Sequence, residues 1–363
     1  MTTQVFGFNE RISLSNKYTN NKIDVMLRIE KTKVQAAKII GEVCGCKKYT
    51  ENLINSSWNE SASAITSLMP AYPYHLKLVM IQSWENMAKK TLIIPDQAKY
   101  LRILLLEIER IQNHLDFIAS IAQSVDYSLL RNKTLQLKEK IGNILKREEN
   151  ALDICFGGVT GELPIDERTT VKLNLQLFLR DFGKVKRKVL RNIILTNQLK
   201  DVGIIARDEA KKLSLSGPIA RSSGITVDVR KSDPYAAYTD FEFSIAVSDN
   251  CDLFGETNVR CQEIEESVAV INQLLEKLPN ESYKADIKGI EIPSCSLIER
   301  IESPNGELFL FIVSQQGTIS CKPKRGNLVL PSKVNKQGFL ARITSEYFDN
   351  IPTIIPSLGN GWI

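Results

Sequence analysis

Helical periodicity is the feature that most constrains the fold of this chain. Between residues 76 and 200, apolar side chains recur at the three- and four-residue spacing of amphipathic helices, over the ranges 76–91, 98–122, 128–152 and 169–200. Pro95 and Asp96 precede the second range, and we expect Asp96 to cap that helix. Antiparallel packing of these helices would bury their apolar faces, so the sequence predicts a helical bundle.

A hairpin is expected near the N-terminus. Residues 1–22 are polar and rich in asparagine, which predicts a loop. From Ile23 to Ile29 every second residue is aliphatic, as in a half-buried strand. A turn at 31–33 and a return strand over 34–40 complete the predicted hairpin, which ends at Gly41.

The chain changes character after about residue 215, where Ser216-Gly217-Pro218 stops the helical pattern. Residues 258–278 have the pattern of an amphipathic helix. Strand patterns predict a strand over 241–247 and a hairpin that joins 308–313 to 318–321.

Together these patterns predict an α+β protein that is mainly α, with a helical bundle core and small β hairpins near the N- and C-terminal parts. We divide the chain into a hairpin region (1–60), a helical bundle (61–215) and a mixed C-terminal part packed on the bundle (216–363). Since no low-complexity linker or internal repeat separates these parts, we expect one integrated domain.

Composition excludes several classes of function. The net charge of +5, from 47 basic and 42 acidic residues, is too small for a nucleic-acid-binding protein. The seven cysteines include no C-x-x-C pair, which favours a reducing compartment. We expect no signal peptide at Met1–Glu10 and no transmembrane segment, because no run of 18 apolar residues occurs.

The segment Gly217–Tyr238 carries the strongest motif. It reads G-P-I-A-R-S-S-G-I-T-V-D-V-R-K-S-D-P-Y-A-A-Y. Taken alone, this is a Gly- and Pro-rich loop held by Arg–Asp pairs. Arg221 and Arg230 offer forked donors that suit a carboxylate or a polar buried wall.

This segment resembles the G-P-x-x-R-x-S-G-x-x-x-D-x-R-x-x-x-P-Y-x-x-Y pattern of one protein family. The family comprises the large subunits of energy-converting (group 4, membrane-bound) nickel–iron hydrogenases and the 49-kDa subunit of respiratory complex I. The resemblance implies a hydrogenase large-subunit-like helical fold.

Three flanking segments extend the resemblance, which runs from about residue 23 to the end. Residues 94–115 are similar to the family's P-E-R-A-x-Y-L-R helix, in which Arg110 and His114 share one helical face. Arg260, Glu263 and Ser267 match an R-x-x-E-x-x-x-S helix. Residues 303–308 resemble the A-P-R-G-E-L hairpin, with Asn305 in place of its arginine.

The chain departs from the family at the thiols that bind nickel. The resemblance places one C-x-x-C pair near residues 69–75 and another after 354–358, and neither place has a cysteine. Soft thiolates at that spacing are the ligands of a Ni-Fe centre. We therefore expect no Ni-Fe centre, no metal ligands and no hydrogen turnover in this chain.

Two cysteines near the first hairpin form a candidate cofactor site. Cys44 and Cys46 flank Gly45, and two such thiols bind a metal only with other ligands, or react with an oxidant. The plainer interpretation is two ordinary thiols on a turn. The resemblance places Cys44 at the position of a loop histidine associated with quinone in complex I, which weakens a quinone role.

A candidate acceptor pocket combines Tyr72, Tyr74, His75 and Arg221. A tyrosine hydroxyl and an imidazole are suitable donors to a quinone oxygen, and the resemblance implies a quinone-facing tyrosine in this region. The alternative is a proline-broken turn before the helix of residues 76–91. The further candidates for a position facing the cavity or a partner's cluster are Arg110, His114, Asp228 and Arg230.

His75 and His114 are the only two histidines. A histidine-rich metal centre is therefore excluded, and a Ser-His-Asp hydrolase is disfavoured. We expect His114, within its helix, to be a buried, hydrogen-bonded histidine rather than a ligand.

The basic residues of range 169–200 form a stripe on one helix. The usual meaning is a solvated face, and the alternative is a docking surface for an acidic partner or a membrane. The stripe consists of Arg180, Lys184, Lys186, Arg187, Lys188 and Arg191.

The resemblance implies an electron-transfer subunit of a membrane-associated NADH dehydrogenase-like or hydrogenase-like oxidoreductase complex. The expected partners are a small 20-kDa-like iron–sulfur subunit, a 30-kDa-like subunit and a membrane subunit, with this chain peripheral on the cytoplasmic side. It binds no cofactor firmly itself: the iron–sulfur cluster belongs to a partner, quinone is the candidate acceptor, and NAD binding in this chain is not expected. The alternative is a non-catalytic paralogue that keeps only the assembly surface.

Overall fold

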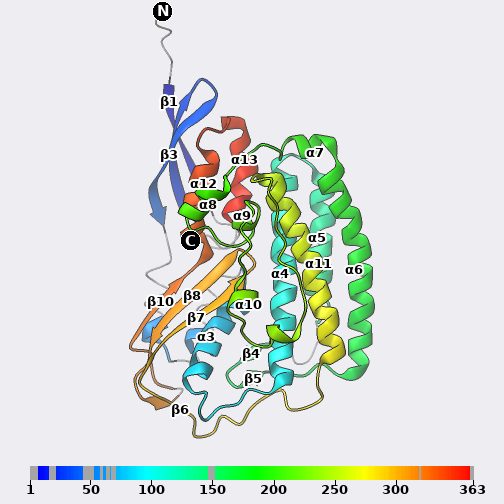
Figure 1. The fold of residues 1–363 in the computed structure, drawn as a ribbon, viewed down its shortest axis with the longest axis vertical. Coiled ribbons are helices and arrows are strands. Elements are labelled where there is room, and N and C mark those ends of the chain that lie inside the picture. The colour runs from blue at the N-terminus through cyan, green and yellow to red at the C-terminus, as the bar shows by residue number, and fades with distance from the viewer. Residues whose placement is uncertain are drawn as a thin grey trace, which may run out of the picture.

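The computed structural model describes residues 7–15, 22–43, 53–57, 60–62, 66, 71–145, 152–318 and 320–359. Figure 1 shows a bundle of long helices along one side of the molecule and small antiparallel sheets along the other. The expected mainly α member of the α+β class is confirmed.

The bundle consists of four long helices, as the periodicity predicted. Helix α4 packs against α5 and α11, and α6 packs against the same two neighbours. Their apolar faces meet in one large buried cluster, which explains the three- and four-residue spacing. The bounds are α4 (Asp96–Ser124), α5 (Ser128–Gly142), α6 (Ile165–Arg191) and α11 (Leu253–Lys277).

Two details of the helix prediction were wrong. Asp96 does not cap α4: Pro95 precedes the helix, and Asp96 lies in its first turn, where it accepts a hydrogen bond from Lys99. An acidic side chain there still stabilises the helix, because it faces the positive end of the helix dipole. The range 169–200 is split at Asn192, whose side chain caps the short α7 (Ile193–Asn197).

The N-terminal sheet has the order β1-β2-β3 and is antiparallel. The predicted hairpin is confirmed as β2 (Lys22–Glu30) and β3 (Lys33–Val43). The predicted loop over residues 1–22 was wrong in part, because Gly7–Ser15 forms β1 on the edge of this sheet. Strand β1 is mostly exposed, so it lacks the apolar alternation that marks a half-buried strand.

The C-terminal sheet has the order β10-β8-β7. It contains β7 (Ser296–Ser303), β8 (Gly306–Val313) and β10 (Arg325–Val329). The predicted hairpin joined the wrong strands. β8 pairs with β7 through the tight turn at 304–305, whereas β9 (Gly317–Thr318) pairs with β6 (Glu291–Ile292).

The strand predicted over residues 241–247 was also wrong. This segment is extended but joins no sheet within the described part of the chain. It lies along α11, where the Gln273 and Glu266 side chains accept from the backbone N–H groups of Glu242 and Ser244. Alternating burial arises here because one edge of an extended chain faces a helix.

Short elements join the bundle to the sheets. Helix α3 packs on β7 and β8 and also contacts α4, while α9 contacts α11 and α10 contacts β7. The motif segment therefore lies between bundle and sheet (Figure 1). These elements are α3 (Pro73–Met87), β4 (Ile154–Cys155), β5 (Gly158–Val159), α8 (Arg207–Lys212), α9 (Pro218–Arg221), α10 (Val229–Ser232), η1 (Tyr238–Asp240), α12 (Pro331–Ile343), η2 (Phe348–Asn350), α13 (Ile351–Ile354) and η3 (Ile355–Leu358).

Residues from all three proposed parts of the chain contribute to the main hydrophobic cluster. The division into those parts remains a prediction. Among the described residues, no helix combines the length and the apolar content needed to cross a bilayer.

Candidate functional site

The start of the motif segment is fixed by a close approach between two pieces of backbone. Gly217 has a φ of 74°, and a Cβ atom there would lie 2.4 Å from the carbonyl oxygen of Asn305. Only glycine fits this position. The contact joins α9 to the turn between β7 and β8, and so sets Arg221 above the end of β7.

Arg221 connects the bundle to the sheet. Its Nε donates to Glu263 of α11 at 2.7 Å, and its Nη1 donates to Glu302 of β7 at 2.8 Å. Asp228 is a third acidic neighbour, at 3.6 Å. Although burial acts to lower the pKa of Arg221, these carboxylates raise it, so the side chain stays charged.

Arg230 makes a second such connection. Its Nε and Nη2 form a two-point contact with Asp228, at 3.0 and 2.7 Å, and its Nη1 donates to Glu107 of α4 at 3.1 Å. Glu107 also accepts from Tyr238 and Ser267. Burial acts to raise the pKa of Asp228, but the neighbouring arginines lower it to about 2.

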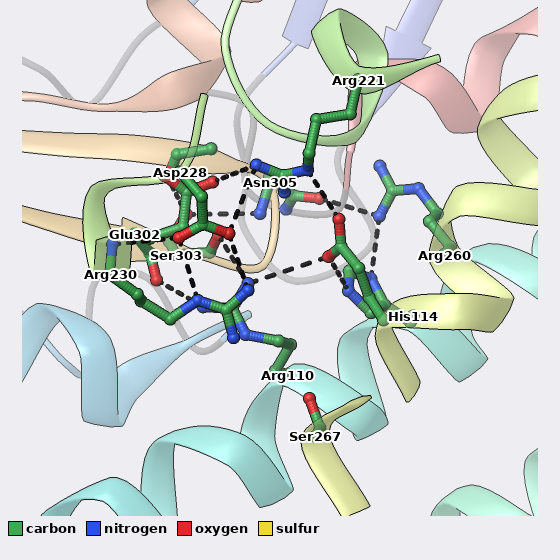
Figure 2. Close-up of polar contacts among 12 residues, drawn as sticks. Arg110, His114, Arg221, Asp228, Arg230, Arg260, Ser267, Glu302, Ser303 and Asn305 are labelled. Carbon is green, nitrogen blue, oxygen red and sulfur yellow. Dashed lines mark hydrogen bonds and ion pairs between the residues drawn. The ribbon is translucent and has the colours of Figure 1, made fainter. Parts of the chain in front are cut away.

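Arg110 and His114 lie on one face of α4, as their spacing predicted (Figure 2). Arg110 donates to the backbone carbonyls of Glu302 and Ser303. Burial lowers the pKa of His114 to about 4, so its ring is neutral. Since Arg260 donates to Nδ1 at 3.2 Å, the ring proton lies on Nε2 and is donated to Glu263 at 2.7 Å. The expectation of a buried, hydrogen-bonded His114 is confirmed.

Glu256 extends these contacts to the C-terminal part. It accepts from Arg260 and from Arg342 of α12. We call the connected set the ionic cluster, and all of its members are buried. It contains five arginines, Arg110, Arg221, Arg230, Arg260 and Arg342, and five carboxylates, Glu107, Asp228, Glu256, Glu263 and Glu302.

The balance of opposite charges makes this cluster a structural lock. A buried ion costs several kcal/mol of desolvation unless a partner of opposite charge compensates it. Here each arginine has at least one carboxylate within ion-pair distance. The cluster therefore ties α4, α9, α10, α11, α12 and β7 to one another.

A separate polar pair lies at the start of α3. His75 Nδ1 is 2.5 Å from Glu109 Oε2, and the backbone N–H groups of Tyr74 and His75 donate to the same carboxyl group. Burial raises the pKa of Glu109 to about 8 and lowers that of His75 well below its usual value. At neutral pH the carboxyl is thus protonated and donates to Nδ1, which leaves the ring proton on Nε2.

The Nε2 atom of His75 has no hydrogen-bond partner among the described residues. The side chain is fully buried. Buried N–H groups almost always find a partner, so this atom marks a place where another polar group fits. Tyr74, the neighbouring residue, is part-buried, and burial raises the pKa of its hydroxyl to about 12.

The structure divides the candidate residues into two groups. Arg110, His114, Arg221, Asp228 and Arg230 meet in the ionic cluster. Tyr72, Tyr74 and His75 lie apart from them at the start of α3, and none of these three lines either of the two described pockets. Arg221 lines neither pocket. Cys44 and Cys46 lie outside the described residues.

Sequence reasoning missed the acids that complete both groups. Glu109 is the partner of His75, yet it lies 34 positions away in the chain. Glu107 and Glu109 interrupt an otherwise apolar run of α4, and both are buried. Two acids in such a run were the available signal.

Thiols do not gather in the described part of the chain. It contains no group of three or more His, Cys, Asp or Glu side chains placed to hold a metal ion. Cys155, Cys251, Cys261, Cys295 and Cys321 are all free. These donors do not fit a Ni-Fe centre.

The basic stripe lies on α6. Lys186 pairs with Glu265 of α11, while Arg180 and Lys184 are mostly exposed and share Asp181. Its alternative role as a docking surface remains a prediction.

Comparison with known proteins gives consistent matches. Residues 130–288 match the family described as "Respiratory-chain NADH dehydrogenase, 49 Kd subunit". The chain is 33% identical over 273 residues to a subunit of the NADH-quinone oxidoreductase of Desulfitobacterium hafniense, and the match covers 72% of this chain and 71% of the relative. It is 30% identical over 291 residues to the subunit of the same name from Clostridium beijerinckii, covering 78% and 76%. It is also 29% identical over 234 residues to a subunit of the F(420)H(2) dehydrogenase of Methanosarcina mazei, covering 61% and 62%.

Proposed function

This chain belongs to the family of the 49-kDa subunit of respiratory-chain NADH dehydrogenase, and from that premise we propose that it is an electron-transfer subunit of a membrane-associated NADH dehydrogenase-like complex. The complex passes electrons from an iron–sulfur cluster in a small partner subunit to a quinone or a similar acceptor. The chain sits peripherally on the cytoplasmic side, next to 30-kDa-like and membrane subunits.

The unpartnered Nε2 of His75 is the observation that carries the acceptor role. A quinone oxygen is a hydrogen-bond acceptor, and the neutral imidazole described above presents a buried N–H group. Tyr74 adds a second polar group from the adjacent position. These residues suit the headgroup of a quinone, whereas they include no thiolate for a Ni-Fe centre.

Reduction of a quinone consumes two electrons and two protons, and this chain contributes to the supply of protons. His75 gives its Nε2 proton to the acceptor oxygen, and Nδ1 takes the proton of Glu109. The imidazole remains neutral throughout. Glu109 becomes a carboxylate that accepts from Nδ1 and from the backbone N–H groups of Tyr74 and His75.

The ionic cluster has a positioning role in this scheme. Arg110 follows Glu109 directly on α4 and is held by the carbonyl groups at the end of β7. Because the cluster fixes this turn of α4 against the sheet, Glu109 is presented to His75 in one orientation.

One observation favours the alternative, a non-catalytic paralogue that keeps the assembly surface. Arg221, Arg230 and His114 all find their partners within the chain. A scaffold requires nothing more than this compensated interior.

Purification of the native complex tests both proposals. Subunits that co-purify with the tagged chain are identified by mass spectrometry, and quinone reduction is assayed with the His75→Gln variant and the unaltered chain. The acceptor role predicts loss of quinone reduction with an intact set of subunits. Full activity in the variant favours the scaffold, and a chain that purifies alone contradicts both proposals.

A further inference from the structure

A polar pocket lies away from both groups described above. Its walls come from the second half of α3, the start of α4, residues 233–236 and β7. The pocket has a volume of about 470 Å³. This is within the range of about 300 to 1,000 Å³ that is usual for sites filled by a ligand.

Glu299 of β7 lines this pocket and has no cationic partner. Its side chain is only 7% exposed. Both carboxyl oxygens accept from neutral amides, Gln82 at 2.6 Å and Asn86 at 2.8 Å. No lysine, arginine or histidine of the described residues lies within ion-pair distance of it. Burial raises the pKa of Glu299, as expected for a carboxylate that lacks a cation.

Most other charged groups in the pocket wall are already compensated. Arg102 forms a two-point contact with Glu85 at 2.7 and 2.6 Å. Arg300 donates to Glu307 at 2.5 Å, and Lys99 to Asp96 at 2.7 Å. The pocket therefore contains one buried acid whose charge the described residues leave unmatched.

Apolar side chains surround the opening. Ile298, next to Glu299 on β7, is 54% exposed, and Ile93, which precedes the pocket residue Ile94, is 84% exposed. Apolar groups around a buried polar anchor are typical of the centre of a protein–protein interface. A free small amine would leave these isoleucines in water.

We propose that this pocket receives an arginine or lysine side chain of a partner protein, which pairs with Glu299 while Ile93 and Ile298 pack against the partner's surface. The proposal rests on the proposed function, since it requires that the chain is part of an assembly. The incoming cation replaces water around the carboxylate and gives it the charge partner that the chain itself does not provide.

The first test measures dissociation of the purified native complex. Removal of one partner of a buried ion pair acts mainly on the dissociation rate. Glu299→Gln keeps the shape and the amide contacts but removes the charge, and we expect it to release the chain roughly 30-fold faster, which is about 2 kcal/mol. The matched control, Glu291→Gln, removes an exposed acid outside the pocket and leaves the rate unchanged. An unchanged rate for Glu299→Gln overturns the proposal.

A second test identifies what occupies the pocket. Ile298→Cys carries a photoactivatable cross-linker in the assembled complex, and mass spectrometry locates the linked peptide. A partner peptide with an arginine or lysine within a few positions of the linked residue supports the proposal. Links only to this chain, or to a partner segment without a basic residue, overturn it.

Lys89 provides the internal alternative. It lines the pocket and forms no ion pair with the described residues. If Lys89 turned inward to neutralise Glu299, Lys89→Met would speed dissociation as much as Glu299→Gln, and that result overturns the proposal. We expect Lys89→Met to have little effect. Failure of the proposed function is distinct, because in that case no subunits co-purify even with the unaltered chain.

Discussion

The ionic cluster and the His75–Glu109 pair are both buried and polar, but they treat charge in opposite ways. In the cluster, carboxylates raise the pKa of Arg221, and arginines lower that of Asp228 to about 2. In the pair, burial raises the pKa of Glu109 to about 8. Groups of the first kind stay charged at any physiological pH, whereas a group of the second kind can gain or lose a proton near neutrality. The cluster is suited to holding elements together, and the pair is suited to proton transfer.

The largest effect is expected when the cluster loses one charge. Arg221→Met leaves Glu263 and Glu302 buried with fewer cations, which costs about 3 to 5 kcal/mol in the free energy of unfolding. Denaturant-induced unfolding measures this cost. If Arg221→Met changes stability by less than about 1 kcal/mol, the cluster is not the lock described here.

The two histidines provide a direct comparison of the two regions. His75→Gln removes the proton donor, and we expect quinone reduction by the complex to fall about 100-fold. His114→Gln disturbs the contacts with Glu263 and Arg260, so it lowers stability by about 1 to 3 kcal/mol and leaves the rate of the folded complex nearly unchanged. Equal losses of activity in the two variants would remove the distinction.

The pH dependence of stability tests the pair by itself. Above its usual pKa of 4.5, an unfolded Glu109 has released the proton that the folded chain keeps up to about pH 8. Stability therefore falls as pH rises toward 8. His75, whose folded pKa is lowered from 6.5, changes stability only below pH 6.5, where its contribution is lost as pH falls.

Between pH 6.5 and 8, then, Glu109 alone of this pair lowers stability, by up to about 2 kcal/mol. Glu109→Gln should remove that decline, because the amide does not titrate. Unfolding curves at the two pH values, with Glu291→Gln as the control, measure the difference. A decline that persists in Glu109→Gln would show that the carboxyl does not hold its proton.

The smallest effect is expected on the exposed surface. Lys186 and Glu265 form an ion pair whose side chains are 27% and 44% exposed. Water and salt screen such a pair, so Lys186→Met should change stability by less than about 1 kcal/mol. A cost near that of Arg221→Met would mean that burial does not set the strength of these contacts.

Local sequence predicted some parts of this molecule well and others poorly. The bundle followed from apolar periodicity, because α4, α5, α6 and α11 each bury one face. Strand β1 escaped prediction, since it is held by main-chain pairing to β2 and buries little. The segment 241–247 misled it, because an extended chain beside α11 alternates in burial as a strand does.

The candidate site shows the same division. Arg221, Asp228 and Arg230 were found because they lie together in one motif. Their partners were not found, since Glu302 contacts Arg221 across 81 positions and Glu107 contacts Arg230 across 123. No local pattern records which distant acid compensates which arginine.

The long reach of the ionic cluster also sets an order of events during synthesis. Its members extend from Glu107 to Arg342, and Glu256 pairs with both Arg260 and Arg342. At a translation rate of about 5 to 20 residues per second, tens of seconds separate the first member from the last. Throughout that interval the growing chain carries acids and arginines whose final partners do not yet exist. The interior therefore closes only when the C-terminal part has left the ribosome, and until then the nascent chain depends on water or on a chaperone to keep those charges apart from wrong partners.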